Sequence, residues 1–497
     1  MRAILSQPSW QLSLCSGVLV GFAYQPWHLG FLAYVGFIPV FHIFINHSAK
    51  ENLRQGYLFG ITLNLVSFYW IGFNSGASIG VVLLSLIAAV LYLSVFWAIA
   101  GWVMGRFKEC ANLSILFPFV IVSMEWFRSF GPMGFPWGNL ALTQTDYLSL
   151  LQIMELAGSY IIAIWVIAIN VILYAMIQNK LPKSTFGILI LVFLGLMVMG
   201  SSRMKAYENF DPVFDIAVLQ PNIDPNEKWD HSKKEETIAI MDSLHAEAQN
   251  LNPDLIVFPE TALPAYLRLN TKIRNVIQSR VDSSGIPVLS GTVDRRFGLD
   301  GEKEYFNSTM LLLPENKYRM YEKIHLVPFA EYIPFSNRFP LLKKFNFGQG
   351  NFSHGNEFVV YEWDSIRFSS LICYESSIPG ICRRFVQKGA DILMILTNDG
   401  WLGNTTGPYQ HYQVAILRAI ENRVPVVRSA NTGISGVILA NGRTVHKESL
   451  GERAVFKSSI SRGNTGSVYS RFGDVFSLVC FVIFVYLGPI SCLRKKY

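Results

Sequence analysis

The chain has 497 residues, of which 51% are hydrophobic and only 15% are charged, against about 25% charged in ordinary soluble proteins. This composition excludes a disordered chain, and six cysteines are too few and too scattered for a disulfide framework. The net charge of +7 does not indicate a nucleic-acid partner, because no long basic run occurs in the more polar part of the chain.

The charged residues are unevenly distributed along the chain. Only 13 of the 77 precede residue 201, so the first 200 residues are about 6% charged and the remainder about 22%. A membrane-spanning helix needs about 20 mainly apolar residues. We therefore expect a membrane domain over 1–200, a water-soluble domain over 201–472, and a last span with a basic tail over 473–497.

About eight apolar stretches have the length and composition of spanning helices, seven before the soluble domain and one after it. They lie near 9–25, 29–46, 57–74, 80–104, 112–127, 159–178, 185–200 and 473–492. If the N-terminus is cytoplasmic, ten Lys and Arg residues fall in the inner segments and only Arg128 in the outer short loops. This asymmetry predicts that both termini are cytoplasmic and that the soluble domain lies on the outer face, which is periplasmic in a bacterium.

Three charged residues, Glu125, Arg128 and Glu155, lie at or near the ends of predicted spans. Charge is costly inside a bilayer, so we expect either a structural ion pair at the interface or contact with a lipid head group. The segment that follows, 131–138, cannot be regular helix because it contains two prolines and three glycines.

The soluble part alternates short apolar runs with helical patterns, which indicates an α/β domain. Strands are expected at 213–220, 254–258, 286–290, 310–313, 368–373, 391–396, 425–427 and 434–439, and helices at 232–250 and 409–422.

Three residues in this part form a complete set for acyl transfer. Glu260 follows a predicted strand in a Pro-flanked turn, Lys323 has charged and apolar neighbours, and Cys373 ends another predicted strand. A thiol with a free pKa of about 8.5 attacks only when deprotonated, and a nearby carboxylate can take its proton. A nearby ammonium can stabilise both the thiolate and the oxyanion of a tetrahedral intermediate.

The order of these residues and their neighbours resembles the nitrilase superfamily. The similar segments are Phe258-Pro-Glu-Thr261, Glu322-Lys-Ile-His-Leu-Val-Pro-Phe329 and Ile372-Cys-Tyr-Glu375. The resemblance runs from about 213 to 460 and implies a four-layer αββα sandwich. Such a domain between seven spans and an eighth is similar to the bacterial apolipoprotein N-acyltransferase family.

Three further segments support the second resemblance: Glu125-Trp-Phe-Arg128, Gly134-Phe-Pro-Trp137 and Thr397-Asn-Asp-Gly-Trp401. The chain departs from the family at Gly400, where Ala is more often expected.

The resemblance implies a role for each matching residue. Cys373 is expected to be the nucleophile, Glu260 the general base and Lys323 the oxyanion stabiliser. Four residues are expected to support the active site, and two to contact substrate. The supporting residues are Glu331, Tyr374, Glu375 and Asn307, and the contact residues are Trp229 and Trp401.

The implied reaction takes a fatty acyl chain from a membrane phospholipid, through a Cys373 thioester, to the amino group of a diacylated apolipoprotein. The enzyme is expected to be a monomer in the bacterial inner membrane that needs no metal and no cofactor. The aromatic runs 345–347 and 409–412 and the turn at Trp401 are candidates either for dipping into the membrane interface or for packing in the core.

Three alternatives to this function remain from the sequence. The first is a membrane-tethered amidase that uses water as the second nucleophile. The second is a transporter whose soluble domain only binds a ligand, although the spans carry few central charges. The third is an inactive scaffold, against which the intact set of Glu260, Lys323 and Cys373 argues.

Overall fold

A computed structural model describes residues 2–208, 213–298, 301–336, 338–339, 341, 351–463 and 466–496. The chain forms two compact units. The first comprises Met1–Gly72, Leu83–Ala206 and Phe472–Tyr497, and the second comprises Phe73–Val82 and Tyr207–Arg471. The predicted aromatic run 345–347 lies outside the described residues.

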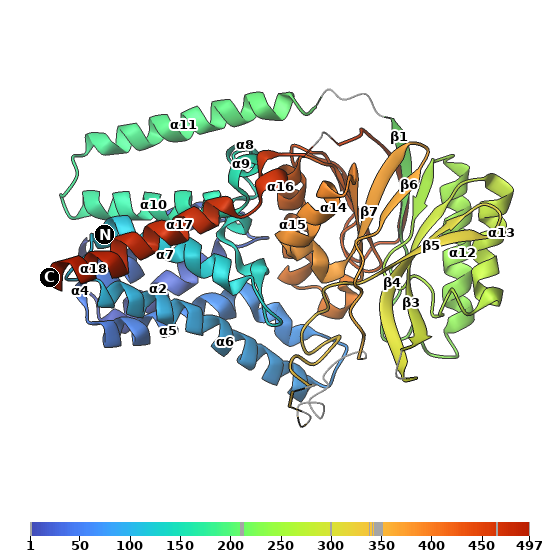
Figure 1. The fold of residues 1–497 in the computed structure, drawn as a ribbon, viewed down its shortest axis with the longest axis horizontal. Helices are drawn as coiled ribbons and strands as arrows, with labels where there is room; N and C mark the ends of the chain where they lie inside the picture. The colour runs from blue at the N-terminus through green and yellow to red at the C-terminus, as the bar shows by residue number, and fades with distance from the viewer. Residues whose placement is uncertain are drawn as a thin grey trace. The chain divides into compact units, whose positions relative to one another are not determined.

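The first unit is helical. Its principal helices are α2 (Ser9–Phe22), α4 (Ile38–Asn46), α5 (Ala49–Phe68), α6 (Ile79–Arg106), α7 (Leu113–Arg128), α10 (Tyr160–Ile177), α11 (Ser184–Lys205) and α17 (Val475–Val485). Short helices connect them: α1 (Arg2–Leu5), η1 (Gly30–Leu32), α3 (Ala33–Gly36), η2 (Tyr69–Phe73), η3 (Pro136–Gly138), η4 (Leu140–Gln144), α8 (Leu148–Leu151), α9 (Met154–Ala157), η8 (Tyr486–Ile490) and α18 (Ser491–Lys496). Figure 1 shows these helices in blue, cyan and green, with the C-terminal helix in red.

Five helices among the described residues are long and apolar enough to cross a membrane. They are 49–73, 79–106, 160–177, 184–205 and 475–493. The helices at Ser9–Phe22 and Gly30–Asn46 are shorter than 18 residues, and α7 has only 16. The number eight therefore stays a prediction. The third helix begins at Ala49 rather than near 57, because Ser48 caps it by accepting from the Glu51 amide.

The charged residues of α7 and its neighbourhood form ion pairs. Glu125 and Arg128 are buried and their charged atoms lie 3.8 Å apart, while Glu155 pairs with Arg203 at 2.7 Å. Glu125 also accepts from the Leu140 amide at 3.0 Å. These contacts support the structural interpretation of the three charges.

The second unit contains two six-stranded sheets. The first has the order β12 (Ala454–Ile460), β1 (Phe214–Gln220), β2 (Leu255–Val257), β3 (Val288–Phe297), β4 (Lys303–Leu313), β5 (Lys317–Glu322). The second has the order β11 (Thr444–Lys447), β10 (Gly436–Ile438), β9 (Val426–Ala430), β8 (Ile392–Thr397), β7 (Ile366–Ile372), β6 (Val360–Trp363). In each sheet three central strands are parallel and the outer pairings are antiparallel.

Helices cover the outer faces of the paired sheets. Figure 1 shows α12 (Lys234–Asn250) and α13 (Thr271–Ser284) on one side, and α14 (Pro379–Gln387) and α15 (Thr406–Asn422) on the other. Apolar side chains of α12 and α13, such as Met241 and Ile277, pack on β1, β2 and β4. Between the sheets, Thr309 of β4 bonds to Ser370 of β7 at 2.6 Å. The predicted four-layer αββα sandwich is therefore confirmed.

The direction of the strands sets where the predicted site residues emerge. β2 is parallel to β3, and two antiparallel pairings then make β5 parallel to β3 as well. Consequently β2 and β5 end at the same edge of the first sheet, and Glu260 and Lys323 follow those ends. In the second sheet β7 and β8 are parallel, so Cys373 and Asp399 leave from a common edge.

Candidate active site

Glu260 lies in a tight turn directly after β2. The turn fits against β3 because Gly291 has no side chain: a Cβ there would lie 2.5 Å from Glu260 Cα and 2.5 Å from the Pro259 carbonyl oxygen. Backbone bonds from Gly291 N to Pro259 O (3.1 Å) and from Ala262 N to Gly291 O (3.0 Å) fix the turn. Thr261 adopts a left-handed φ of 46°, a strained conformation for a β-branched residue.

Lys323 is an almost completely buried ammonium, with 1% of its surface exposed. Its Nζ lies 2.8 Å from Glu331 Oε2 and 2.9 Å from Oε1. Burial by itself would lower the pKa of Lys323, but the carboxylates of Glu331 and Glu260 outweigh burial and raise that pKa above its ordinary value. The ion pairs therefore favour the charged form of Lys323.

Asn307 of β4 connects the two carboxylates that surround this cation. Its Nδ2 donates to Glu260 Oε1 at 2.8 Å and to Glu331 Oε1 at 2.9 Å. Its backbone carbonyl accepts from the Lys323 amide at 2.8 Å. One residue therefore fixes Glu260, Glu331 and Lys323 relative to one another.

Cys373 is the first residue after β7 and opens the short helix η6 (Cys373–Ser377). It has a left-handed φ of 51°, which costs on the order of 1–3 kcal/mol for a residue with a side chain. Burial raises the pKa of the Cys373 thiol well above its usual range; the Glu260 carboxylate raises it further and the Lys323 ammonium opposes both. The resting thiol is therefore protonated and lies within electrostatic reach of a carboxylate and an ammonium.

Glu375 holds the turn that follows Cys373. It is fully buried, and its Oε1 accepts from Tyr321 Oη at 2.7 Å and from the Ile324 amide at 2.8 Å. Its Oε2 accepts from the Ile372 amide at 2.8 Å. The side chain thus ties the cysteine turn of the second sheet to the lysine segment of the first. Tyr374 is buried against His325, with ring centroids 5.9 Å apart.

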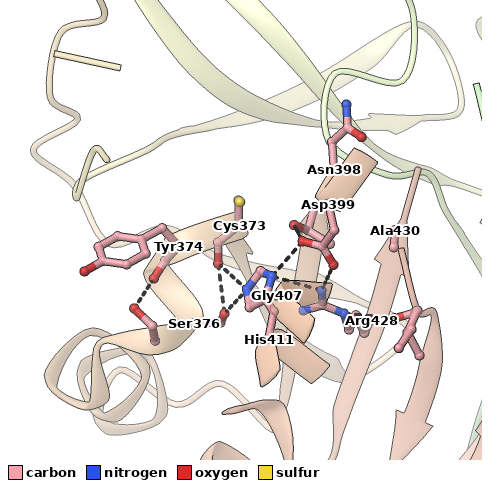
Figure 2. Close-up of polar contacts among 12 residues, drawn as sticks. Cys373, Tyr374, Ser376, Asn398, Asp399, Gly407, His411, Arg428 and Ala430 are labelled. Atoms are coloured by element: carbon pink, nitrogen blue, oxygen red, sulfur yellow. Dashed lines mark hydrogen bonds and ion pairs between the residues drawn. The ribbon is translucent and has the colours of Figure 1, made fainter. Parts of the chain in front are cut away.

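A second buried hydrogen-bond network contacts the backbone carbonyl of Cys373 (Figure 2). Asp399 Oδ1 lies 2.7 Å from His411 Nδ1, and Arg428 pairs with the other oxygen of Asp399. His411 Nε2 lies 2.9 Å from Ser376 Oγ, which donates to the Cys373 carbonyl at 2.8 Å. Although burial opposes ionisation, the charges of Arg428 and His411 lower the pKa of Asp399 to about 2. The network anchors the carbonyl of the strained residue.

Cys373, Asp399 and His411 also offer ligand atoms that all lie within 4.8 Å of one another. By type they resemble a zinc set. However, His411 and Arg428 occupy both oxygens of Asp399, and a guanidinium at the carboxylate repels a metal cation. We therefore interpret the cluster as a hydrogen-bond network.

A cavity of about 560 Å³ opens beside Glu260 and Asn307. Trp229 and Trp401 line it; Trp229 is 48% exposed, and Trp401 is partly buried in the turn η7 (Asp399–Leu402). The segment between η2 and α6 approaches this wall, because the Ser75 amide donates to the Trp401 carbonyl at 2.8 Å. Within the described chain, Cys373 and Lys323 are not part of the lining.

The structure thus connects six of the nine predicted site residues by hydrogen bonds or electrostatic coupling: Glu260, Lys323, Cys373, Glu331, Asn307 and Glu375. Tyr374 adjoins the cysteine, and the two tryptophans line the cavity. Of the two roles expected for the run 409–412, core packing is the one that Tyr412 has, because its ring is buried under β10 and its hydroxyl bonds to Thr444.

Sequence reasoning missed His411, Arg428 and Lys228 as members of this region. Asp399 enters the sequence analysis only as part of a segment, His411 stands among polar and aromatic residues, and Arg428 follows a short apolar run, so no motif marks either one. Gly400 departs from the expected Ala, and the structure gives a reason: a Cβ there would lie 3.0 Å from Thr432 Cβ and 3.1 Å from Pro225 Cδ.

Comparisons with known proteins agree with this geometry. Residues 16–172 match the family model of the apolipoprotein N-acyltransferase N-terminal domain, and residues 215–469 match that of carbon-nitrogen hydrolase. The chain is 32% identical to an apolipoprotein N-acyltransferase of Geobacter metallireducens, covering 98% of this chain and 95% of the relative. It is 28% identical to an apolipoprotein N-acyltransferase of Chlorobaculum tepidum, and the match covers 100% of this chain and 98% of the relative.

Solved structures of a nitrilase-superfamily amidase from Nesterenkonia are also similar to part of the chain. One has a TM-score of 0.39 and 17% identity, covering 50% of this chain and 91% of the amidase.

The fold and the site define a bacterial membrane enzyme whose soluble unit is a carbon-nitrogen hydrolase domain of the nitrilase superfamily. The match to relatives over nearly the whole chain identifies a narrower family than the carbon-nitrogen hydrolase class. The chain belongs to the apolipoprotein N-acyltransferase family, and its enzymatic class is acyltransferase.

Gly291→Ala tests how strictly the Glu260 turn depends on the missing side chain. The new Cβ would push the Glu260 backbone by up to an ångström, and such misplacement costs about a hundredfold in rate. We expect acyltransferase activity to fall by that order while the protein remains folded. Gly380→Ala in α14, where nothing lies within 4 Å of the new Cβ, is the matched control and should keep its activity.

Arg428→Met tests whether the buried network is held by the Asp399 charge. Removing the guanidinium leaves a buried carboxylate, a change that costs about 3–5 kcal/mol, or about 10 °C in Tm for a domain of this size. Adding Asp399→Asn should recover part of this loss, measured by thermal unfolding of the detergent-solubilised chain. If the loss of stability in the double variant equals the sum of the losses in the two single variants, Arg428 and Asp399 are not coupled as described.

Proposed function

We propose that the chain transfers a fatty acyl group from a membrane phospholipid to the α-amino group of the N-terminal S-diacylglyceryl-cysteine of apolipoproteins. The reaction has two halves, separated by a thioester between the acyl group and Cys373. Each half uses the same base and the same cation.

In the first half, Glu260 accepts the proton of the Cys373 thiol while sulfur attacks the ester carbonyl carbon of the phospholipid. The carbonyl π electrons move to oxygen, and the Lys323 ammonium stabilises that oxyanion. Collapse of the intermediate breaks the bond to the glycerol oxygen, which takes the proton back from Glu260. The products are a lysophospholipid and an acylated Cys373.

The electrostatics of the site suit this order of events. A thiol whose pKa is raised by burial is protonated at rest and needs a base at the moment of attack. Burial also raises the pKa of Glu260, against the lowering effects of Lys323 and Asn307, and a more basic carboxylate is a better proton acceptor near neutral pH.

In the second half, the lipoprotein amine attacks the thioester carbon. Glu260 takes a proton from the attacking nitrogen, Lys323 again faces the oxyanion, and the carbon–sulfur bond breaks. Cys373 leaves as a thiolate and recovers the proton from Glu260. The acyl group is then held in an amide.

The observation that carries this proposal is the set of bonds linking Glu260, Asn307, Glu331 and Lys323 beside a strained cysteine. Glu331 and Asn307 orient the base and the cation, and Glu375 positions the turn of the nucleophile. Trp229 and Trp401 are assigned to substrate contact because they line the cavity next to Glu260.

We further propose that the enzyme is a monomer of the inner membrane, with the soluble domain on the periplasmic face and both termini in the cytoplasm. The ten-to-one distribution of Lys and Arg between the inner and outer short segments supports this orientation. Both substrates carry lipid anchors, so an enzyme held in the same membrane meets them without extracting either one.

Intact-protein mass spectrometry after mixing the chain with phospholipid alone tests the first half-reaction. We expect a fatty-acyl adduct that neutral hydroxylamine removes. Cys373→Ala should show no adduct. Cys382→Ala should show it, because Cys382 is a fully buried thiol on α14 whose charged neighbours are Arg418, Glu421 and Glu375 and not Lys323 and Glu260.

A folded wild-type chain that forms no adduct with any phospholipid, even after rapid quenching, would overturn the proposed donor reaction. Turnover of small amides without lipid would then favour the amidase alternative. Relatives over the whole chain are named as acyltransferases, which makes that alternative the weaker one.

The pH dependence of adduct formation reports the ionisation of Glu260. The rate should fall as the pH drops through the pKa of Glu260, because only the carboxylate accepts the thiol proton. Asn307 stabilises that carboxylate by a hydrogen bond, so Asn307→Ala should raise the pKa and move the acid limb upward by about one pH unit. Ser308→Ala, on the next residue of β4, serves as the control; a downward shift in Asn307→Ala would contradict the assignment.

A further inference from the structure

Lys228 is, besides Lys323, a second buried lysine among the described residues, and the mechanism above does not use it. It lies in the turn after β1, has 2% of its surface exposed, and lines the cavity beside Glu260. Its Nζ donates to the Thr261 carbonyl at 2.8 Å. Burial lowers the pKa of Lys228 to about 8, and the Glu260 carboxylate acts in the opposite direction. The side chain is still mostly protonated at pH 7.

The surroundings of Lys228 differ from those of the catalytic lysine. Lys323 has a carboxylate at 2.8 Å, whereas Lys228 has, among the described residues, one carbonyl acceptor and no carboxylate within 4 Å. An ammonium has three N–H donors, and burying its charge without a counter-ion costs several kcal/mol. The site is therefore arranged for an anion that completes the pairing.

The cavity has the composition that such an anion and its apolar attachment require. Its charged lining residues are Lys228, Lys303 and Glu260, so the lining carries a net positive charge. Aromatic side chains form much of the remaining wall: Trp229, Tyr266, Tyr305, Phe352 and Trp401. A lining that combines ammonium groups with aromatic rings fits an amphiphile with an anionic head.

We propose that Lys228 binds the phosphate of the phospholipid acyl donor and thereby selects phosphate-bearing lipids over other esters. The inference rests on the function proposed above. Glu260 belongs both to the cavity and to the group around Cys373, so a donor with its phosphate on Lys228 lies beside the base that starts the reaction.

A different role for Lys228 would be to tune Glu260, whose charge it feels. That role would change the acylation rate for every ester equally, because the base serves each donor in the same way. Phosphate binding changes only the rate for donors that carry a phosphate. The two roles are therefore distinguished by the ratio of the acylation rate with a phosphate-bearing donor to the rate with a phosphate-free ester.

The experiment measures acylation of Cys373 in the full-length chain with two donors that share the palmitoyl group. One is a dipalmitoyl phospholipid, and the other is p-nitrophenyl palmitate, an ester without phosphate. A charge-assisted hydrogen bond is worth about a tenfold to hundredfold effect. We expect Lys228→Met to lower the ratio of kcat/KM for phospholipid over ester by that factor.

Two further variants complete the test. Lys228→Arg keeps a cation and should recover part of the ratio, while Lys272→Met removes an exposed lysine of α13 and should leave the ratio as in the wild type. An unchanged ratio in Lys228→Met overturns the phosphate assignment, whatever the absolute rates. A wild-type chain that the ester acylates but no phospholipid acylates instead refutes the donor in the proposed function, and the inference falls with it.

Discussion

The buried ammonium of Lys323 is the group on which the rest of the site depends. A charge in that position is tolerable only with carboxylates beside it, and this requirement places Glu331 at 2.8 Å and draws Glu260 into the same cluster. Asn307 then has to satisfy both carboxylates at once. The arrangement of two carboxylates, one ammonium and a bridging amide therefore offsets the cost of burying the Lys323 charge.

Much of the fold and the central chemistry follows from the sequence because fully buried strands are continuous apolar runs. β8 is buried along its whole length, and its boundaries match the prediction within one residue. Glu260 and Cys373 each come shortly after such a run, whereas Lys323 follows the polar, largely exposed β5 and was identified only through the segment that resembles the nitrilase superfamily. The strand β12 was not predicted, because buried and exposed residues alternate along it. It also pairs with β1, which lies more than 230 residues earlier in the chain. The number of spans was uncertain because α2 and α7 are shorter than a bilayer requires.

The residues that sequence reasoning missed share a property: their importance arises from burial that no local pattern signals. Lys228 stands in a charged run, Glu227-Lys-Trp-Asp230, that is typical of a solvated turn, yet its side chain is enclosed. His411 lies in the predicted helix 409–422 among other polar residues, and Arg428 lies one residue beyond the predicted strand 425–427. Their partner Asp399 comes from the end of β8, so only the assembled second sheet brings the three together.

The bonds of Glu375 have a consequence for the biogenesis of the enzyme. Its carboxylate joins the cysteine turn to Tyr321 and to the backbone after β5, which belong to the other sheet. The left-handed conformation of Cys373 therefore has its full support only after both sheets have formed and docked. A newly made chain holds Cys373 in an unconstrained conformation until that point, so an incompletely folded copy lacks the assembled site of the acyltransferase domain.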